Sequence, residues 1–180
     1  SNIKDLDVPE IPIFKTEKVR FNFDNNLKRW FRRNLGLWRS RRQYIFEDKE
    51  VFNVEMYTKF ETIIDDLSGN ERYLFSWWSD KDYDLFHSKP SLKKEGKIIA
   101  DLLGHQLYQN NVITKDRPII SHIRQVDEHE LIFESNEKSC YTLEHIRLID
   151  NDRYRSRVIY TWENDYLTIV ENCHEIRLSA

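Results

Sequence analysis

Hydrophobic and polar residues alternate with a period of two along most of this chain, from residue 37 onward. In segment 37–47, Trp38, Tyr44 and Phe46 fall on one face and Arg39 falls on the other. This period is typical of a half-buried β-strand, because successive side chains of a strand point to opposite faces. The pattern predicts strands at 37–47, 51–64, 71–79, 118–126, 130–136, 139–149, 153–161 and 165–178.

A shorter segment before the strands has helical spacing instead. Over residues 25–35, large apolar residues recur at intervals of three and four, as on one face of an amphipathic helix. These residues are Leu27, Trp30, Phe31 and Leu35. Residues 1–23 are polar, contain Pro9 and Pro12, and are expected to form an extended arm.

Two segments between the predicted strands have a less regular pattern. Residues 80–92 are typical of a loop. Residues 93–109 fit a helix in part, but Gly96 and Gly104 interrupt the helical spacing, so a strand followed by a turn fits as well. The pattern leaves both interpretations of this segment open.

Short polar pairs such as Asn136-Glu137 separate the later strands. Connections this short favour antiparallel neighbours. One helix followed by about eight strands predicts a mainly all-β fold, an antiparallel up-and-down β-barrel with an N-terminal α-helix across it. At 180 residues the chain has the length of one such domain, which we assign to residues 24–180.

The composition excludes several classes of protein. The formal net charge is −3, with charged residues of both signs making up 33% of the chain, which argues against a protein that coats nucleic acid. No apolar run approaches the roughly 20 residues that span a bilayer, and we recognise no signal peptide. We therefore expect neither nucleic acid nor a membrane as partner.

Familiar catalytic and metal-binding motifs are also missing from the sequence. It contains no Gly-rich phosphate loop, His-Glu-x-x-His or Cys-x-x-Cys, and its six histidines are scattered without metal-ligand spacing. We expect no metal site. Cys140 and Cys173 fit free thiols in a reducing compartment, although a disulfide between them also stays open.

Charged residues occur on faces that are otherwise apolar. Arg42 shares a face with Tyr44, and Glu144 shares a face with Ile146 and Leu148. A buried guanidinium needs a carboxylate, an aromatic face or a ligand anion as partner. A carboxylate among apolar side chains often has a raised pKa, and such groups gather at functional sites. The alternative for both residues is an ion pair inside the barrel or at its rim.

Three arginines alternate near residue 155 and are expected on one side of one strand: Arg153, Arg155 and Arg157. Facing outward they would form a solvated stripe. Facing inward they would form a cationic wall for carboxylates or phosphates.

The last predicted strand carries polar residues on both faces, and Glu175 shares its face with Cys173 and Arg177. This pattern fits a barrel with a partly polar interior, or an edge strand with a charged outer face. Trp77 and Trp78 point to opposite sides, so only one of them can line an interior.

A closed barrel would bring together six candidate site residues from five strands. They offer cations for carboxylates, carboxylates for N–H donors, and an aromatic wall, so the ligand they imply is flat, conjugated and anionic at one end. The six are Arg42, Trp77, Glu144, Arg153, Arg155 and Glu175.

Three blocks of the sequence are similar to one known family. The first is Leu-Gly-Leu-Trp-Arg-Ser-Arg-Arg at 35–42, whose Gly-x-Trp pairs with a late Arg177, as in lipocalin-like barrels. The second comprises 104–108 (Gly-His-Gln-Leu-Tyr) and 119–122 (Ile-Ile-Ser-His). The third comprises 144–148 (Glu-His-Ile-Arg-Leu), 151–155 (Asn-Asp-Arg-Tyr-Arg) and 173–177 (Cys-His-Glu-Ile-Arg).

In these blocks the chain resembles the S-type phycobiliprotein lyases, over roughly residues 24–178. It departs from the family pattern at Tyr154, where an apolar residue is usual, and in the loop at 80–95. The resemblance implies a lipocalin-like barrel that binds an open-chain tetrapyrrole, phycoerythrobilin or phycocyanobilin. It also implies that the bilin is attached by a thioether bond to a cysteine of a phycobiliprotein subunit, of phycoerythrin or phycocyanin.

The same resemblance implies roles for the candidate residues. Arg42, Arg153 and Arg155 would pair with the bilin propionates, and Trp77 would stack on a pyrrole ring. The two catalytic residues, Glu144 and Glu175, would hold pyrrole N–H groups and supply a proton, a task that favours a carboxyl of raised pKa. The bilin is a substrate, and no cofactor is permanently bound.

The family also suggests a cellular setting and an assembly. It implies a location in the cytoplasm of a cyanobacterium or cyanophage-infected cell, or in the plastid stroma. Members often form dimers, so a homodimer is a candidate assembly.

Two other functions fit the sequence. The first is a carrier or chaperone that protects a bilin without speeding its transfer. The second is a protein-interaction module without ligand that uses the basic and aromatic stretch at 28–42. A bilin titration separates the second from the others, and a transfer assay separates the lyase from the carrier.

Overall fold

The computed structural model describes residues 26–63, 71–112 and 117–180. Residues 26–33 form a helix, which is followed by strands and one short second helix. These are β1 (Gly36–Phe46), β2 (Val51–Ile63), β3 (Glu71–Trp78), α2 (Asp84–Ser88), β4 (Glu95–Leu103), β5 (Gln106–Asn111), β6 (Ile119–Gln125), β7 (Glu130–Glu137), β8 (Cys140–Ile149), β9 (Tyr154–Glu163) and β10 (Tyr166–Ser179).

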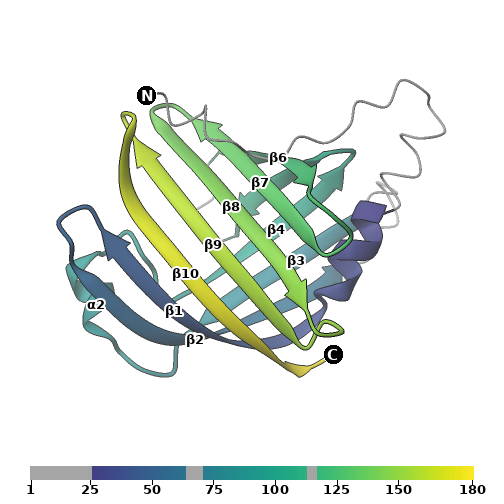
Figure 1. The fold of residues 1–180 in the computed structure, drawn as a ribbon, viewed down its shortest axis with the longest axis horizontal. Coiled ribbons are helices and arrows are strands. Elements are labelled where there is room, and N and C mark those ends of the chain that lie inside the picture. The colour runs from purple at the N-terminus through teal and green to yellow at the C-terminus, as the bar shows by residue number, and fades with distance from the viewer. Residues whose placement is uncertain (1–25, 64–70, 113–116) are drawn as a thin grey trace.

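Each strand pairs antiparallel with the next one in the chain, and β1 pairs with β10, so the described strands form a closed barrel (Figure 1). The prediction of an antiparallel up-and-down barrel with an N-terminal helix is confirmed. The barrel has ten strands rather than about eight because segment 93–109 forms β4 and most of β5, with a turn at Gly104 (φ +61°). The loop at 80–92 contains α2.

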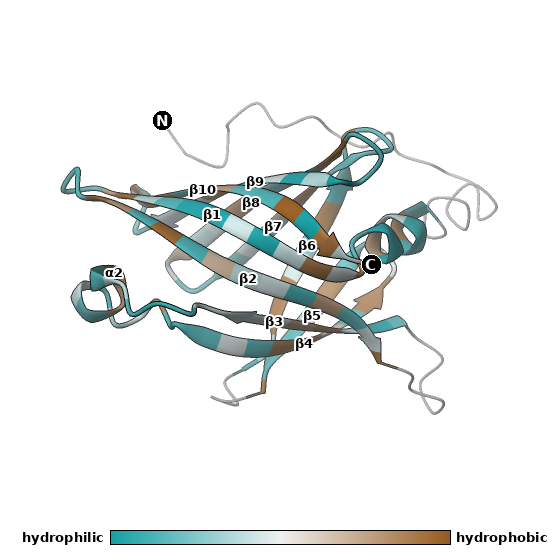
Figure 2. Cartoon of the chain, turned by 90° about the horizontal axis from the view of Figure 1, so that it is seen from below, coloured by the Kyte–Doolittle hydropathy of each residue, from teal (hydrophilic) through white to brown (hydrophobic). Residues whose placement is uncertain are grey.

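The two helices lie at opposite ends of the barrel (Figures 1 and 2). The helix at 26–33 closes one end with its buried residues Trp30 and Phe31. The Phe31 ring stacks on Tyr73 at 5.1 Å and meets Phe133 edge-on at 6.0 Å. Burying a large aromatic side chain contributes about 1.5–3 kcal/mol, so this face holds the helix on the barrel.

Short connections between strands use residues with positive φ. Asn164 and Asp165 do so in the β9–β10 turn (φ 51° and 68°), where these residue types tolerate the left-handed conformation. The β8–β9 turn has three in succession, Asp150, Asn151 and Asp152. This turn delays the start of β9 to Tyr154, which affects the position of the neighbouring arginine.

The barrel closes around Trp38, as the Gly-x-Trp pattern and late arginine predicted. Gly36 has φ +123°, and a Cβ atom there would lie 2.0 Å from the carbonyl oxygen of Ser179, so only glycine fits. The Trp38 ring is fully buried between two guanidinium groups, Arg155 at 4.2 Å and Arg177 at 4.3 Å. Arg177 also donates one hydrogen bond to the carbonyl oxygen of Leu35, just after the helix.

The predicted arm at 1–23 lies outside the described residues. Within the described residues, neither helix has the length and apolar content required to traverse a bilayer. Both cysteines are free thiols, Cys140 partly buried and Cys173 fully buried, which answers the question of a disulfide between them.

Candidate functional site in the barrel interior

A cavity of about 390 Å³ lies inside the barrel. The closing helix bounds one side through Phe31 and Asn34, and aromatic residues from the strands, including Phe75 and Phe133, form much of the wall. Small-molecule sites are commonly apolar cavities of this size with a few polar groups placed in them.

Six charged residues face the interior from β1, β8, β9 and β10, and we call them the interior charge cluster. Their positions follow from the antiparallel register, which places Arg155 opposite Glu175 and pairs β1 with β10. The cluster comprises Arg42, Glu144, Arg155, Arg157, Glu171 and Glu175.

Arg155 is held by protein groups at each nitrogen of its guanidinium. Nε donates to Glu175 at 2.6 Å, Nη1 donates to the Asn34 side-chain oxygen at 3.0 Å, and Nη2 donates to Thr58 at 3.3 Å. The group also lies over the Trp38 ring. Asn34 directly follows the closing helix and donates to the carbonyl oxygen of Trp30 in that helix, so Arg155 ties the helix end to the strands.

Glu175 is the most deeply buried charge, with none of its side chain exposed. Burial alone would raise the pKa of Glu175, but Arg155, Arg157 and Arg42 outweigh it and lower this pKa to about 2. The expected raised pKa of Glu175 is wrong, because two arginines lie within 2.6 and 3.5 Å of its oxygens. An ionised carboxylate of this kind anchors arginines and has no proton to give.

Glu144 and Arg157 form a more accessible pair. Arg157 donates to Glu144 at 2.8 Å, and both side chains are about one-fifth exposed (20% and 22%) and line the cavity. Burial opposes the charge of Arg157, yet Glu144 and Glu175 raise its pKa well above the usual value. Arg157 was missing from the predicted site although the alternating pattern placed it beside Arg155.

Arg42 lies inside the barrel and lines the cavity. Its side chain is 9% exposed, with a hydrogen bond to Ser40 at 3.0 Å and longer contacts to Tyr44 (3.4 Å) and Glu171 (3.6 Å). Its nearest carboxylate is thus 1.0 Å farther than the one that Arg155 holds at 2.6 Å (3.6 − 2.6). Arg42 therefore has the most distant carboxylate partner of the three arginines in the cluster.

Trp77 lines the cavity, whereas Trp78 lies on the outer face and stacks on Tyr57 at 5.8 Å. The expectation that only one of them faces an interior is confirmed. Gly96 of β4 lies under the Trp77 ring, and a Cβ atom there would come within 2.1 Å of it. Gly96 was read from the sequence as a helix breaker, but its structural role is to make room for this ring.

Arg153 does not belong to the site. It lies in the β8–β9 turn, its side chain is 70% exposed, and it pairs with Asp150 at 3.7 Å. The prediction that it shares an inward face with Arg155 is wrong, because the turn with three left-handed residues ends the strand alternation before Tyr154.

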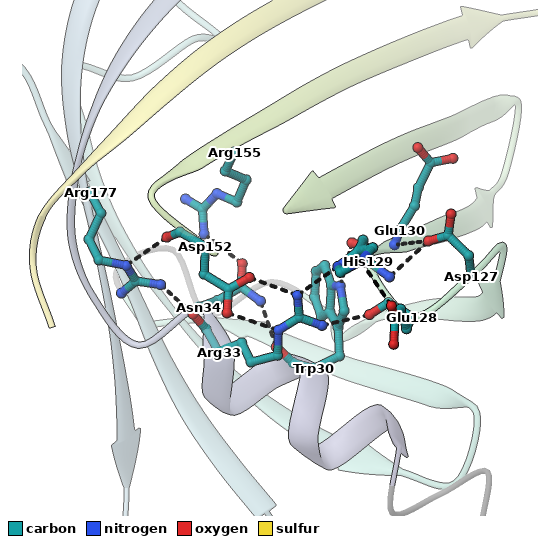
Figure 3. A network of polar contacts seen from close by, with 10 residues as sticks. All are labelled: Trp30, Arg33, Asn34, Asp127, Glu128, His129, Glu130, Asp152, Arg155 and Arg177. Atoms are coloured by element: carbon teal, nitrogen blue, oxygen red, sulfur yellow. Dashed lines mark hydrogen bonds and ion pairs between the residues drawn. The ribbon is translucent and has the colours of Figure 1, made fainter. Parts of the chain in front are cut away.

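A second polar network stabilises the closed end of the barrel (Figure 3), and its main residues, Arg33, Glu128, Asp152 and Arg177, are not among those that line the cavity. Arg33 of the helix binds both carboxylate oxygens of Asp152, at 2.9 and 2.7 Å, and the carbonyl oxygen of Glu128 at 2.6 Å. Arg177 donates to the carbonyl oxygens of Asp152 and Arg33. We call Arg33, Glu128, Asp152 and Arg177 the closed-end network.

This network bears on the basic stretch at 28–42. Arg33 binds Asp152, Arg32 binds Glu71, and Arg42 lies inside the barrel. Arg33 and Arg42 are therefore directed to groups within the protein, whereas Arg32 stays 62% exposed beside Glu71. Among the described residues, no group of His, Cys, Asp or Glu side chains could hold a metal ion.

No family model matches the sequence, and no curated protein does so. Among solved structures, the chain is similar to the S-type phycobiliprotein lyase CpeS from Guillardia theta, with a TM-score of 0.64 and 15% identity over 94% of this chain and 99% of that one. It is also similar to a protein of unknown function from the DUF3598 family of Nostoc punctiforme, with a TM-score of 0.56 and 15% identity over 82% of this chain and 48% of that one. This chain therefore has the lipocalin-like fold of the S-type lyases.

Proposed function

We propose that this protein is a phycobiliprotein lyase that binds an open-chain tetrapyrrole, phycoerythrobilin or phycocyanobilin, in the barrel cavity. The observation that carries the proposal is the combination, in one cavity of about 390 Å³, of aromatic walls with accessible arginine and glutamate side chains. A bilin is flat, carries two propionates and has ring N–H groups. Each of these features has a chemical counterpart among the lining residues.

In the proposed complex, the accessible arginines hold the propionates. Arg157 is partly exposed to the cavity and Arg42 has long contacts to its carboxylate, so both can accept a ligand anion. Arg155, whose three nitrogens are occupied, acts as a positioning residue for the helix and for Glu175. Trp77 provides an aromatic face for a pyrrole ring.

The thiol that forms the thioether belongs to the acceptor subunit. Within this chain, burial raises the pKa of Cys173 far above its usual value, and the thiol is fully buried. Attack of the acceptor thiolate on the ring-A ethylidene carbon forms the S–C bond, shifts the double-bond electrons into the ring system and requires one proton. Glu144, which faces the cavity, is the group we assign as proton donor.

The test has two stages. Mixing with phycoerythrobilin should give a stoichiometric complex with red-shifted absorbance. Transfer to a phycoerythrin subunit should then be faster and more regiospecific than without the protein, and Glu144→Gln should slow it by about 100-fold or more, while the exposed Glu47→Gln should not. Binding without faster transfer would identify a carrier instead of a lyase.

A further inference from the structure

The interior charge cluster is formally neutral, since three arginines face three glutamates. A ligand carboxylate that enters this cluster adds a negative charge among side chains that are at most about one-fifth exposed. An uncompensated charge there is costly. Binding of an anionic ligand therefore requires a compensating change within the cluster.

The carboxylates of the cluster differ in how firmly they are held. Glu175 is fully buried and lies between Arg155 and Arg157. Glu144 has one hydrogen bond to a described residue, from Arg157, and its side chain reaches the cavity. Arg157 keeps Glu175 at 3.5 Å as a second carboxylate if Glu144 leaves. On Arg157, Glu144 is thus the carboxylate that a ligand can replace at the lower cost. The third carboxylate, Glu171, contacts Arg42 at 3.6 Å and is not among the residues that line the cavity.

We propose that a bilin carboxylate takes the place of Glu144 on Arg157 and that the displaced Glu144 takes up one proton. The inference rests on the proposed function. The Glu144–Arg157 ion pair breaks, an ion pair between the bilin carboxylate and Arg157 forms, and a proton from solvent converts the Glu144 carboxylate to a carboxylic acid. The proton balances the charge of the one carboxylate that binds Arg157. The second propionate, which the proposed function places at Arg42, takes no part in this exchange.

The surroundings of Glu144 favour this proton uptake once Arg157 has a new partner. Its neighbour across β7 is Phe133, which carries no charge, and the helix contributes Phe31 and Asn34 to the same cavity. A carboxylate left without its cation among such groups gains by becoming neutral. The other titratable groups that face this interior are Arg42, Tyr44, Arg155, Arg157, Glu171, Cys173 and Glu175. Lys59 also borders the cavity, but its side chain is 48% exposed and pairs with Glu61 at 3.4 Å, so it lies outside the cluster.

The exchange would also explain how Glu144 acquires the proton that it donates. Before binding, Glu144 accepts a hydrogen bond from Arg157 at 2.8 Å. Binding supplies the proton and leaves it beside the ligand. The proton donor would therefore be formed only when substrate is present, which links binding to the chemical step.

Calorimetric titration with phycoerythrobilin, in neutral buffers of different ionisation enthalpy, tests the exchange by counting the protons taken up. When the bilin with free carboxylates binds to the native protein, the complex should take up about one proton per bilin bound. The dimethyl ester of the same bilin has no free carboxylate and should bind without proton uptake. The variant Glu144→Gln should bind the free acid without proton uptake.

The outcomes separate this inference from the function on which it rests. Binding of the free acid without proton uptake, or equal uptake by Glu144→Gln, would overturn the exchange and leave the proposed lyase in place. Equal uptake with the ester would overturn it too, because the proton would then go to the bilin nitrogens. Absence of any bilin binding would overturn both.

Discussion

Arginines lie at the closed end of the barrel and in its cavity, but they differ in how completely protein acceptors bind their N–H groups. At the closed end, Arg33 and Arg177 bind Asp152 and main-chain carbonyl oxygens, so protein acceptors occupy their N–H groups (Figure 3). In the cavity, Arg42 and Arg157 have fewer or longer contacts and border open space.

The difference shows how to separate structural from functional arginines in a polar interior. Arg155 lines the cavity, yet its partners Glu175, Asn34 and Thr58 leave it with a structural role. Arg157, two residues further along the same strand face, shares one of these partners but keeps an exposed side. The strand face on which an arginine lies predicts which residues surround it. Whether its N–H groups are all bound by protein acceptors predicts whether it is structural or available to a ligand.

The largest effect is expected at the structural pair. Glu175→Gln leaves Arg155 buried without its carboxylate, which should lower the free energy of unfolding by about 3–5 kcal/mol in urea denaturation. The matched variant Glu171→Gln should cost clearly less, since its contact to Arg42 is 3.6 Å long and its side chain is partly exposed. An equal loss of unfolding free energy in both variants would contradict the distinction between the tightly held Arg155–Glu175 pair and the looser Arg42–Glu171 pair.

Acid should affect the same pair. The pKa of Glu175 is about 2 in the folded protein, against an ordinary value of 4.5, so the unfolded chain binds more protons between these values. The contribution of Glu175 is therefore complete above about pH 4.5 and is lost as pH falls toward 2. Urea denaturation at a series of pH values should show a fall in stability over this window that is smaller in Glu175→Gln.

A moderate effect on stability alone is expected at the closed end. Arg33→Met removes the two hydrogen bonds to Asp152, and because the pair is partly exposed we expect a loss of about 1–2 kcal/mol. Bilin affinity should stay within about twofold, since the residues of the network do not line the cavity. A large loss of affinity at unchanged stability would show that the closed end takes part in binding.

The smallest effect is expected at the aromatic wall. Gly96→Ala places a methyl group against the Trp77 ring, and moving the ring into the cavity should weaken bilin binding by about tenfold or less. Tryptophan fluorescence and a bilin titration would measure both consequences. Trp78→Phe, on the outer face, should change the fluorescence and leave the affinity unaltered.

Most of the fold followed from the sequence, because residues alternate between a buried and an exposed face along each strand. The exception was segment 93–109, where Gly96 and Gly104 disturb a helix and a strand equally. The segment forms strands because it pairs with β3 and β6. Pairing between separate segments of the chain cannot be read from the residue pattern of one segment.

The site was predicted less completely. Alternation placed Arg42, Glu144 and Arg155 in the interior correctly, but it extended to Arg153 because the turn before β9 was assigned to the strand. The low pKa of Glu175 depends on arginines from neighbouring strands, which no single-strand pattern reveals. The bond from Arg155 to Asn34 joins residues 121 positions apart and had no signal in the sequence.

The central claim is that the barrel interior binds a bilin through Arg157, and one absorbance titration tests it most directly. Arg157→Gln and Arg153→Gln remove the same charge two positions apart, the first inside the cavity and the second on the exposed turn. The account predicts that phycoerythrobilin binds the native protein and Arg153→Gln alike, and binds Arg157→Gln about 10- to 100-fold more weakly. Equal affinity for the two variants, or no spectral change with any bilin, would contradict it.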